Sequence, residues 1–109
     1  MDRRVGWSPE ALDDVEAIAE YIARDSSAYA AAVVHRIIEA SRKLAAFPEI
    51  GRIVPELGDE SVRELFVYSY RLIYRIKTDT VLVVAAVHGK RLLDIQTGLD
   101  PQHDHSRPA

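Results

Sequence analysis

The residues whose types and spacing most clearly suggest a functional site are basic side chains in the second half of the sequence. Side chains alternate between the two faces of a strand, which places Arg71, Arg75 and Lys77 on one face of an expected strand. Arg63 and Arg91 lie in neighbouring stretches and join this face if the strand register brings them opposite it. Several guanidinium groups on one sheet bind phosphates through paired, charge-assisted hydrogen bonds. We therefore expect these five side chains to bind a polyanion or an acidic partner, with a plain solvated surface as the alternative.

His88 and Glu64 are the attractive acid/base candidates near these cations. Cleavage of RNA without a metal needs a base that takes the 2′-hydroxyl proton, an acid for the leaving oxygen and cations for the pentavalent phosphate. A nuclease would therefore use Arg71 and Arg91 together with His88 or Glu64. The opposing hypothesis is that Glu64 pairs with the arginines and that His88 has no catalytic role.

Other catalytic or cofactor-binding patterns are missing from the sequence. It contains no cysteine, which excludes disulfides, thiolate metal sites and thiol nucleophiles. It also contains no phosphate-binding glycine loop and no serine triad. His103 and His105 have a spacing that could touch a metal, but without further ligands they would form at most an adventitious site. We expect neither a cofactor nor a bound metal.

The composition is that of one ordinary globular domain. The chain has 109 residues, of which 48% are hydrophobic and 28% are charged, and a single domain usually has roughly 100 to 150 residues. Residues 1–25 hold seven acids and three bases, whereas residues 61–93 hold six bases and two acids. An acidic or polyanionic partner would therefore meet the second half. No apolar run approaches the roughly 18 residues of a membrane span, so we expect a cytoplasmic protein without a membrane partner.

Two amphipathic stretches predict a helical hairpin. Ser8 and Pro9 mark the start of a first helix, as N-cap and first helical residue, and this helix is expected to run to Arg24. A break at residues 25–27 supplies the cap of a second helix, which is expected to end near Ala46. Apolar residues recur at a three-four spacing in both stretches, so each helix has one stripe for a core.

Strand-like stretches surround this hairpin. One short strand precedes the first helix, and three strands follow a loop rich in proline and glycine; the expected strands cover residues 3–7, 61–68, 70–77 and 81–87, and the loop covers residues 47–60. The last strand is apolar on both faces, which suits a central strand. We therefore expect an α+β fold of order β-α-α-β-β-β, with the two-helix hairpin packed on one face of a small, mostly antiparallel sheet.

The faces of these elements define an expected core. In the strand over residues 70–77, the tyrosines and their apolar neighbours take the face toward the helices, and the basic residues take the opposite face. Trp7, Tyr70 and Tyr74 are interpreted as packing aromatics. The side chains expected to be buried are Leu12, Val15, Ile18, Ile22, Val34, Ile37, Leu44, Leu72, Tyr74, Val83 and Val87.

Short motifs occur in a recognisable order along the chain. They are W-S-P-E-A-L-D-D at residues 7–14, F-P-E-I-G-R at 47–52, V-R-E-L at 62–65, Y-R-L-I-Y-R at 70–75 and H-G-K-R at 88–91. Each is short, and their combination in this order is much stronger than any one of them. On these residues the chain resembles ParE-like toxins of the RelE/ParE superfamily, a group of type II toxin–antitoxin proteins that includes plasmid stabilisation proteins. The resemblance implies one toxin domain over residues 1–93, and we expect a mobile tail over residues 94–109.

The resemblance also implies partners and a target. It implies a cytoplasmic toxin and a cognate antitoxin whose C-terminal segment wraps the toxin, with operator DNA a partner only through the antitoxin complex. In RelE-like nucleases, lysines and arginines of the sheet and a tyrosine of the C-terminal segment cut mRNA on the ribosome. Arg71 and Arg91 match basic positions of that set, and Arg63 is a candidate for another.

This chain departs from the nuclease pattern. Glu64 and Leu65 follow Arg63 in the region where a second basic residue would stand, and no tyrosine follows Tyr74. The departures favour the ParE-like branch, whose known members inhibit DNA gyrase and do not cut RNA. We therefore expect a toxin that binds gyrase, because a binder needs shape and a few anchors and no catalytic set. The alternatives are a ribosome-dependent mRNA endonuclease and a non-toxic, degenerate family member.

Overall fold

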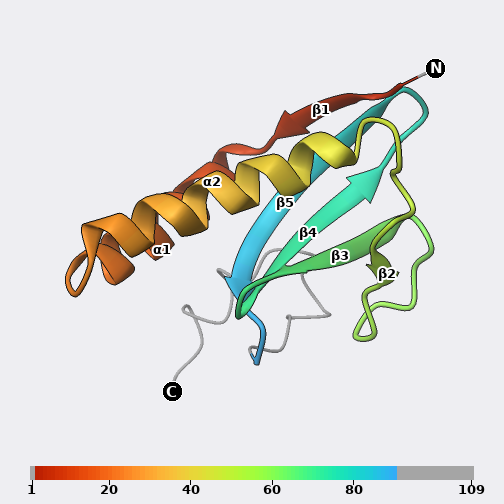
Figure 1. Cartoon of the computed structure of the whole chain (residues 1–109). Helices are drawn as coiled ribbons and strands as arrows, with labels where there is room; N and C mark the ends of the chain where they lie inside the picture. The colour runs from red at the N-terminus through yellow and green to blue at the C-terminus, as the bar shows by residue number, and fades with distance from the viewer. Residues whose placement is uncertain (1, 91–109) are drawn as a thin grey trace.

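The described part of the chain forms a five-stranded sheet with two helices on one face (Figure 1). The computed structural model describes residues 2–90, so the tail expected at residues 94–109 lies outside the described residues. In chain order the elements are β1 (Arg4–Trp7), α1 (Pro9–Ala23), α2 (Ser27–Lys43), β2 (Arg52–Ile53), β3 (Val62–Val67), β4 (Tyr70–Ile76) and β5 (Thr80–His88). The expected α+β fold is confirmed, with β2 as an additional short strand.

Both helices begin at the serines that the sequence marks as caps. The Ser8 hydroxyl accepts a hydrogen bond from the Ala11 N–H at 3.0 Å, and the Ser26 hydroxyl accepts one from the Tyr29 N–H at 3.0 Å. These bonds satisfy backbone donors that have no partner inside a first helical turn. The helix ends lie slightly earlier than expected, because residues 44–46 form a turn instead of continuing α2.

The strand order is β1-β5-β4-β3-β2. β1 pairs with β5 in parallel, and the remaining neighbours are antiparallel, so the expectation of a mostly antiparallel sheet is confirmed. β5 lies between β1 and β4, as its apolar run predicts. β2 has only two residues, which is too short for a periodic pattern, and its Arg52 lies opposite Glu64 of β3.

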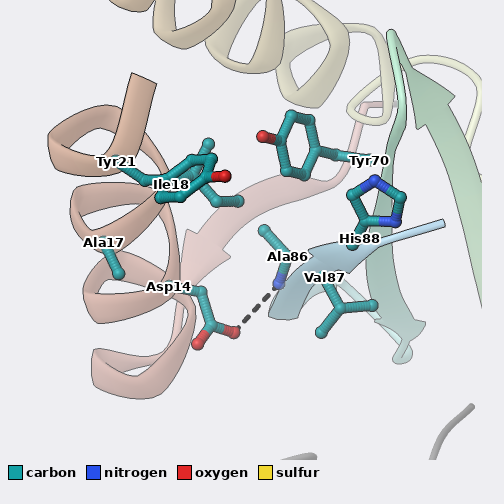
Figure 2. Close-up of a pocket in the computed structure, with 8 residues that line it drawn as sticks. All are labelled: Asp14, Ala17, Ile18, Tyr21, Tyr70, Ala86, Val87 and His88. Atoms are coloured by element: carbon teal, nitrogen blue, oxygen red, sulfur yellow. Dashed lines mark hydrogen bonds between the residues drawn. The ribbon is translucent and has the colours of Figure 1, made fainter. Parts of the chain in front are cut away.

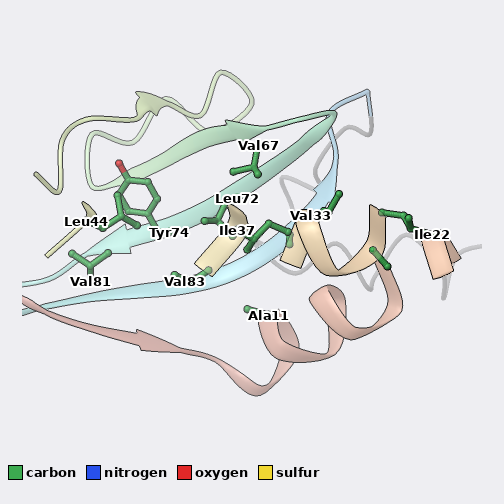
Figure 3. Close-up of a cluster of buried hydrophobic side chains, with 12 residues drawn as sticks. Ala11, Ile22, Val33, Ile37, Leu44, Val67, Leu72, Tyr74, Val81 and Val83 are labelled. Carbon is green, nitrogen blue, oxygen red and sulfur yellow. The ribbon is translucent and has the colours of Figure 1, made fainter. Parts of the chain in front are cut away.

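The larger core lies between the helices and the sheet (Figure 3). α1 packs on β5, and α2 packs on β3. Trp7 and Tyr70 are half-buried at the border of this core, in agreement with their interpretation as packing aromatics. Its buried side chains are Ala11, Ile22, Ala30, Val33, Ile37, Leu44, Val67, Leu72, Tyr74, Val81, Val83 and Ala86. Burial of one aliphatic side chain is worth about 1.5 to 3 kcal/mol, so this core attaches the hairpin to the sheet.

Most of the expected core residues are buried, and one is not. The buried ones are Ile22, Ile37, Leu44, Leu72, Tyr74, Val83 and Val87, while Val15, Ile18 and Val34 are half-buried. The prediction for Leu12 is wrong, because this side chain is 55% exposed. Ala11 takes the inward position instead and starts a stripe that continues every three or four residues through α1 to Ile22.

A second, smaller core covers the opposite face of the sheet. Its buried side chains are Val54, Val62, Ile73, Ala85 and Val87, with Leu57 and Val84 packed against them. Val54 and Leu57 belong to the segment between α2 and β3, which therefore crosses this face. Arg71 and Arg75 lie on this face of β4 as expected, but the connecting segment covers its central part.

A bulge in β5 changes which side chains face the helices. Ile73 lies opposite Ala85, but the next residue of β4, Tyr74, lies opposite Val83, so Val84 is an extra residue in β5. Before the bulge, Val83 faces the helices; after it, the even-numbered Ala86 does so. The strand alternation then places His88 on the helix side as well.

Candidate functional site

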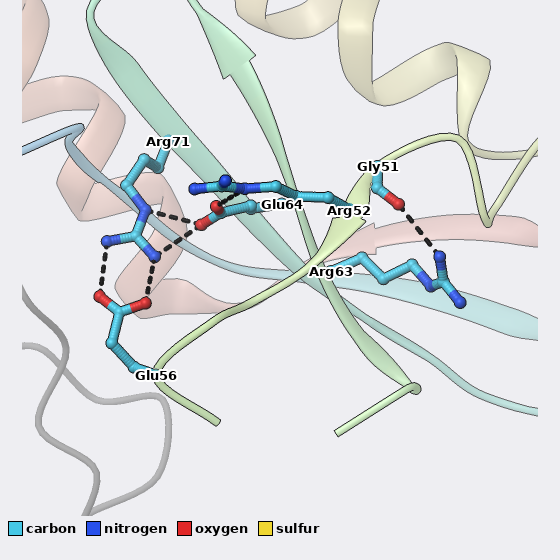
Figure 4. Close-up of polar contacts among 6 residues, drawn as sticks. All are labelled: Gly51, Arg52, Glu56, Arg63, Glu64 and Arg71. Carbon is cyan, nitrogen blue, oxygen red and sulfur yellow. Dashed lines mark hydrogen bonds and ion pairs between the residues drawn. The ribbon is translucent and has the colours of Figure 1, made fainter. Parts of the chain in front are cut away.

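Arg71 is a buried residue in an ion-pair network (Figure 4). Its Nη1 and Nη2 atoms donate to the two carboxylate oxygens of Glu56 at 2.8 Å each. Its Nε and Nη2 atoms both lie 2.6 Å from Oε1 of Glu64. Arg52 donates from its Nε to the other oxygen of Glu64. Two guanidinium groups therefore face two carboxylates, and only 3% of Arg71 remains exposed.

The strand register brings these charges together. Arg71 lies opposite Phe66, so Glu64 is its diagonal neighbour on the same face of the sheet, and Arg52 lies directly opposite Glu64. Glu56 comes from the connecting segment that crosses this face. The hydrogen bonds to Glu56, followed by those to Glu64, raise the pKa of Arg71 against the opposing effect of burial. The network thus fixes the connecting segment to the sheet.

Arg63 also fastens this segment and does not point to open solvent as a free cation. Its Nη1 atom donates to the Gly51 carbonyl at 3.1 Å, and its Nε atom donates to the Glu60 carbonyl at 3.1 Å. Backbone carbonyls therefore engage its Nε and Nη1 atoms, which leaves fewer donors for phosphate binding.

The structure shows why the F-P-E-I-G-R motif has a glycine at position 51. A Cβ atom at this buried position would lie 2.5 Å from the Glu64 carbonyl oxygen and 2.7 Å from the Tyr74 hydroxyl. The Gly51 N–H donates to that hydroxyl at 2.9 Å. Burial raises the pKa of Tyr74, and the bond from Gly51 partly opposes this effect. The glycine thus lets the chain pass close to β3 and β4.

The remaining cations of the expected basic face do not take part in the ion-pair network. Arg75 is half-buried and lies near Asp59, whose pKa is lowered first by the Ser61 N–H, then by the Ser61 hydroxyl, with a smaller contribution from Arg75. Lys77 is exposed, at the end of the sheet where the Arg3 side chain donates to its carbonyl at 2.9 Å. Arg91 lies outside the described residues.

His88 lies on the opposite side of the sheet from the ion-pair network. It is paired across the strands with Tyr70, and the two rings meet edge to face at 5.8 Å. Arg71 is paired with the preceding residue, Val87, and consecutive residues of a strand point to opposite faces. The Nδ1 atom of His88 accepts a hydrogen bond from the Lys90 N–H at 3.3 Å. The sheet thus separates His88 from Arg71 and Glu64.

His88 and Tyr70 form one wall of a pocket against α1 (Figure 2). The volume of the pocket is about 390 Å³, and its other apolar lining residues are Ala17, Ile18, Tyr21, Ala86 and Val87. Asp14 lines the pocket and accepts the Ala86 N–H at 3.0 Å. Burial raises the pKa of Tyr70, and the phenols of Tyr29 and Tyr21 raise it further.

Four tyrosines gather at this end of the molecule, and we call them the tyrosine patch: Tyr21, Tyr29, Tyr68 and Tyr70. The rings of Tyr29 and Tyr68 meet edge to face at 5.9 Å. The Arg36 guanidinium lies 5.9 Å from the ring centre of Tyr68, and that of Arg24 lies 5.8 Å from the ring centre of Tyr21. The chain has five tyrosines in all, and the fifth is the buried Tyr74.

Sequence reasoning missed the tyrosine patch. The four rings come from α1, α2, the turn after β3, and β4, so no spacing along the chain connects them. Tyr68 occupies that turn with a φ angle of 54°, a left-handed conformation that is uncommon for residues other than glycine. Only the tertiary structure shows that they share a surface.

Within residues 2–90, no group of three or more histidine, cysteine, aspartate or glutamate side chains could hold a metal ion. No helix in that part of the chain is long and apolar enough to cross a membrane. His103 and His105 lie outside the described residues.

Comparisons with known proteins give the class to which this fold belongs. The structure is similar to the chromosomal ParDE system of P. aeruginosa, with a TM-score of 0.66, 20% identity and coverage of 79% of this chain and 95% of that one. It is also similar to the RelBE2 toxin–antitoxin complex of Mycobacterium tuberculosis, with a TM-score of 0.58, 18% identity and coverage of 81% and 99%. A YoeB/ParE toxin from Agrobacterium tumefaciens gives a TM-score of 0.56 at 18% identity, with coverage of 78% and 96%. The chain therefore shares the fold of these structures.

The sequence comparison assigns the chain to a narrower group than the comparison of folds does. Residues 5–93 match the family described as the ParE toxin of the type II toxin–antitoxin system parDE. No curated protein matches the sequence. The match covers most of the chain, so the protein belongs to the ParE toxin family, as its motifs predict.

Proposed function

We propose that this protein is a toxin that acts by binding DNA gyrase and that a cognate antitoxin neutralises it. The carrying observation is that Arg71 and Glu64 are buried in a mutually neutralising network. A phosphate-binding arginine must present free donors to its ligand, whereas the carboxylates of Glu56 and Glu64 already engage Arg71. This arrangement supports a structural role for the two residues that a nuclease would need.

The position of His88 supports the same proposal. A general base must come within about 2.6 to 3.2 Å of the proton that it takes, directly or through one water. The sheet stands between His88 and the Arg71–Glu64 pair, so these groups do not converge on one phosphate within residues 2–90. Arg63, a further cation of the hypothetical set, is bound to backbone carbonyls. Inhibition by binding a target protein does not need catalytic groups that converge on one phosphate.

Family membership and the structural relatives support the proposal that an antitoxin neutralises this protein. The family is named for a type II toxin–antitoxin system, and two of the similar structures are described as the ParDE system and the RelBE2 toxin–antitoxin complex. The exposed apolar and aromatic side chains of the helix side offer a protein surface of the kind that partners cover.

The test combines growth with two activity assays. Expression of the chain alone should stop growth, and co-expression of the protein encoded by the adjacent open reading frame should restore it. Purified toxin should inhibit supercoiling by gyrase and leave mRNA on translating ribosomes intact. Codon-register cuts in ribosome-bound mRNA by the wild-type protein would support the endonuclease instead. A chain that is harmless when expressed alone at good yield would support a degenerate, non-toxic member.

A further inference from the structure

We infer that the tyrosine patch and the pocket beside it form the docking surface for the antitoxin, which inserts an aliphatic side chain into the pocket and places carboxylates against Arg24 and Arg36. This inference rests on the proposed neutralisation by an antitoxin. It adds which part of the toxin the antitoxin covers and what chemistry its segment carries.

The pocket has the size and the lining of an anchor site. Tyr21, Ile18 and Ala86 surround about 390 Å³ of space between α1 and the end of the sheet. Asp14, one of its polar lining residues, accepts the Ala86 N–H and so stabilises the wall. An aliphatic side chain entering this space would displace water from apolar surface, which is the main favourable contribution to most protein associations.

The composition of the rim points to a protein partner. Tyrosine and arginine are over-represented among the residues that dominate binding energy at protein interfaces. Tyr21 is 67% exposed and Tyr68 is 51% exposed, although both are large aromatic side chains. Their rings lie beneath the guanidinium groups of Arg24 and Arg36. Such rings present large contact area at a small cost in side-chain entropy.

The charges at the rim select among partners. Arg24 and Arg36 are exposed cations at the patch, and arginine binds carboxylates through two parallel hydrogen bonds. A segment that carries carboxylates beside its apolar anchor therefore complements the rim. A nucleic acid fits less well, because Asp14 lines the pocket and α1 carries four further acidic residues. A peptide can place a few carboxylates at the arginines alone, whereas the continuous phosphate charge of a nucleic acid would also meet these acids, which would repel it along the helix.

The experiment measures the affinity of the full chain for the purified product of the adjacent open reading frame by calorimetry. Tyr21→Ala and Tyr68→Ala change exposed side chains and should each weaken binding about 30-fold or more, as expected for dominant interface residues. Ala17→Arg changes an exposed helical residue that lines the pocket and should block the anchor without opening a cavity. Thermal unfolding of each variant checks that the fold is retained.

Matched controls lie at the far end of the hairpin. Phe47→Ala removes an aromatic side chain that is as exposed as Tyr21, and Ala46→Arg adds the same charge and bulk as Ala17→Arg. Both controls should leave the affinity within about threefold, since surface positions outside an interface contribute little. Equal weakening by the controls would overturn the inference.

The outcomes separate this inference from the proposed function. If the wild-type chain does not bind the neighbouring product, neutralisation by that protein fails. If the wild-type chain binds and the patch variants bind equally well, neutralisation stands and the docking surface is wrong. A single-stranded RNA oligonucleotide that binds the wild-type chain and loses affinity in Tyr21→Ala and Tyr68→Ala would assign the patch to nucleic acid and overturn the inference.

Discussion

Replacement of Arg71 by alanine is the sharpest perturbation of the ion-pair network. It would leave the carboxylate of Glu64, whose side chain has no solvent exposure, with Arg52 as its remaining cationic neighbour in the network, and it would leave Glu56 without its bidentate partner. Removing one partner of a buried ion pair costs about 3 to 5 kcal/mol, because a buried charge is left uncompensated. Since Arg52 still pairs with Glu64, we expect the lower end, about 3 kcal/mol.

Arg52→Ala is the matched control. The Arg52 side chain is 58% exposed, and its removal leaves Glu64 paired with Arg71. Pairs that involve an exposed partner are worth at most about 1 kcal/mol, so this variant should be destabilised by less than about one third as much. In thermal terms, 3 kcal/mol corresponds to a fall of about 12 °C or more in the unfolding midpoint for a small domain.

The assay is urea unfolding followed by the fluorescence of Trp7, the only tryptophan of the chain. Glu64→Gln in the Arg71→Ala background should restore part of the lost stability, because it removes the uncompensated charge. Equal destabilisation by Arg71→Ala and Arg52→Ala, or no recovery in the double variant, would refute the reasoning.

Two further predictions concern the contact between Gly51 and Tyr74. Gly51→Ala should destabilise the fold by about 1 to 3 kcal/mol, the usual cost of overpacking, because the added Cβ would clash with a backbone oxygen; urea unfolding at a level equal to wild type would contradict this. Because burial raises the folded-state pKa of Tyr74, its contribution to stability is complete below its unfolded pKa, about 10, and is lost as pH rises through the folded pKa. The free energy of unfolding should therefore fall in alkaline solution, and it should fall less steeply in Tyr74→Phe. An equally steep fall in the two proteins would contradict this prediction.

The helices and most strands could be predicted from the sequence because local signals and tertiary packing agree there. Ser8 and Ser26 cap helices whose apolar residues repeat at the helical period, and the run over residues 81–87 is central as expected. Leu12 was misplaced because helical spacing tolerates a shift by one residue, and the small Ala11 fits against the sheet where the larger leucine does not lie.

The candidate site was harder to predict, because two irregular features decide it. The connecting segment before β3 has no period, so nothing in the sequence showed that it would cross the sheet and pair Glu56 with Arg71. The bulge at Val84 reverses the alternation of β5 and moves His88 to the helix side. Alternation alone therefore could not tell whether His88 and Arg71 share a face.

Inhibition of gyrase is the most direct test of the claim that this toxin acts by binding. Purified wild-type protein would be titrated into a supercoiling reaction with relaxed plasmid and gyrase, with the product of the adjacent open reading frame added in a parallel series. We predict dose-dependent inhibition that the second protein reverses, with ribosome-bound mRNA left intact at the same concentrations. If expression of the chain arrests growth but the purified protein leaves supercoiling unimpaired at every dose, the account is contradicted.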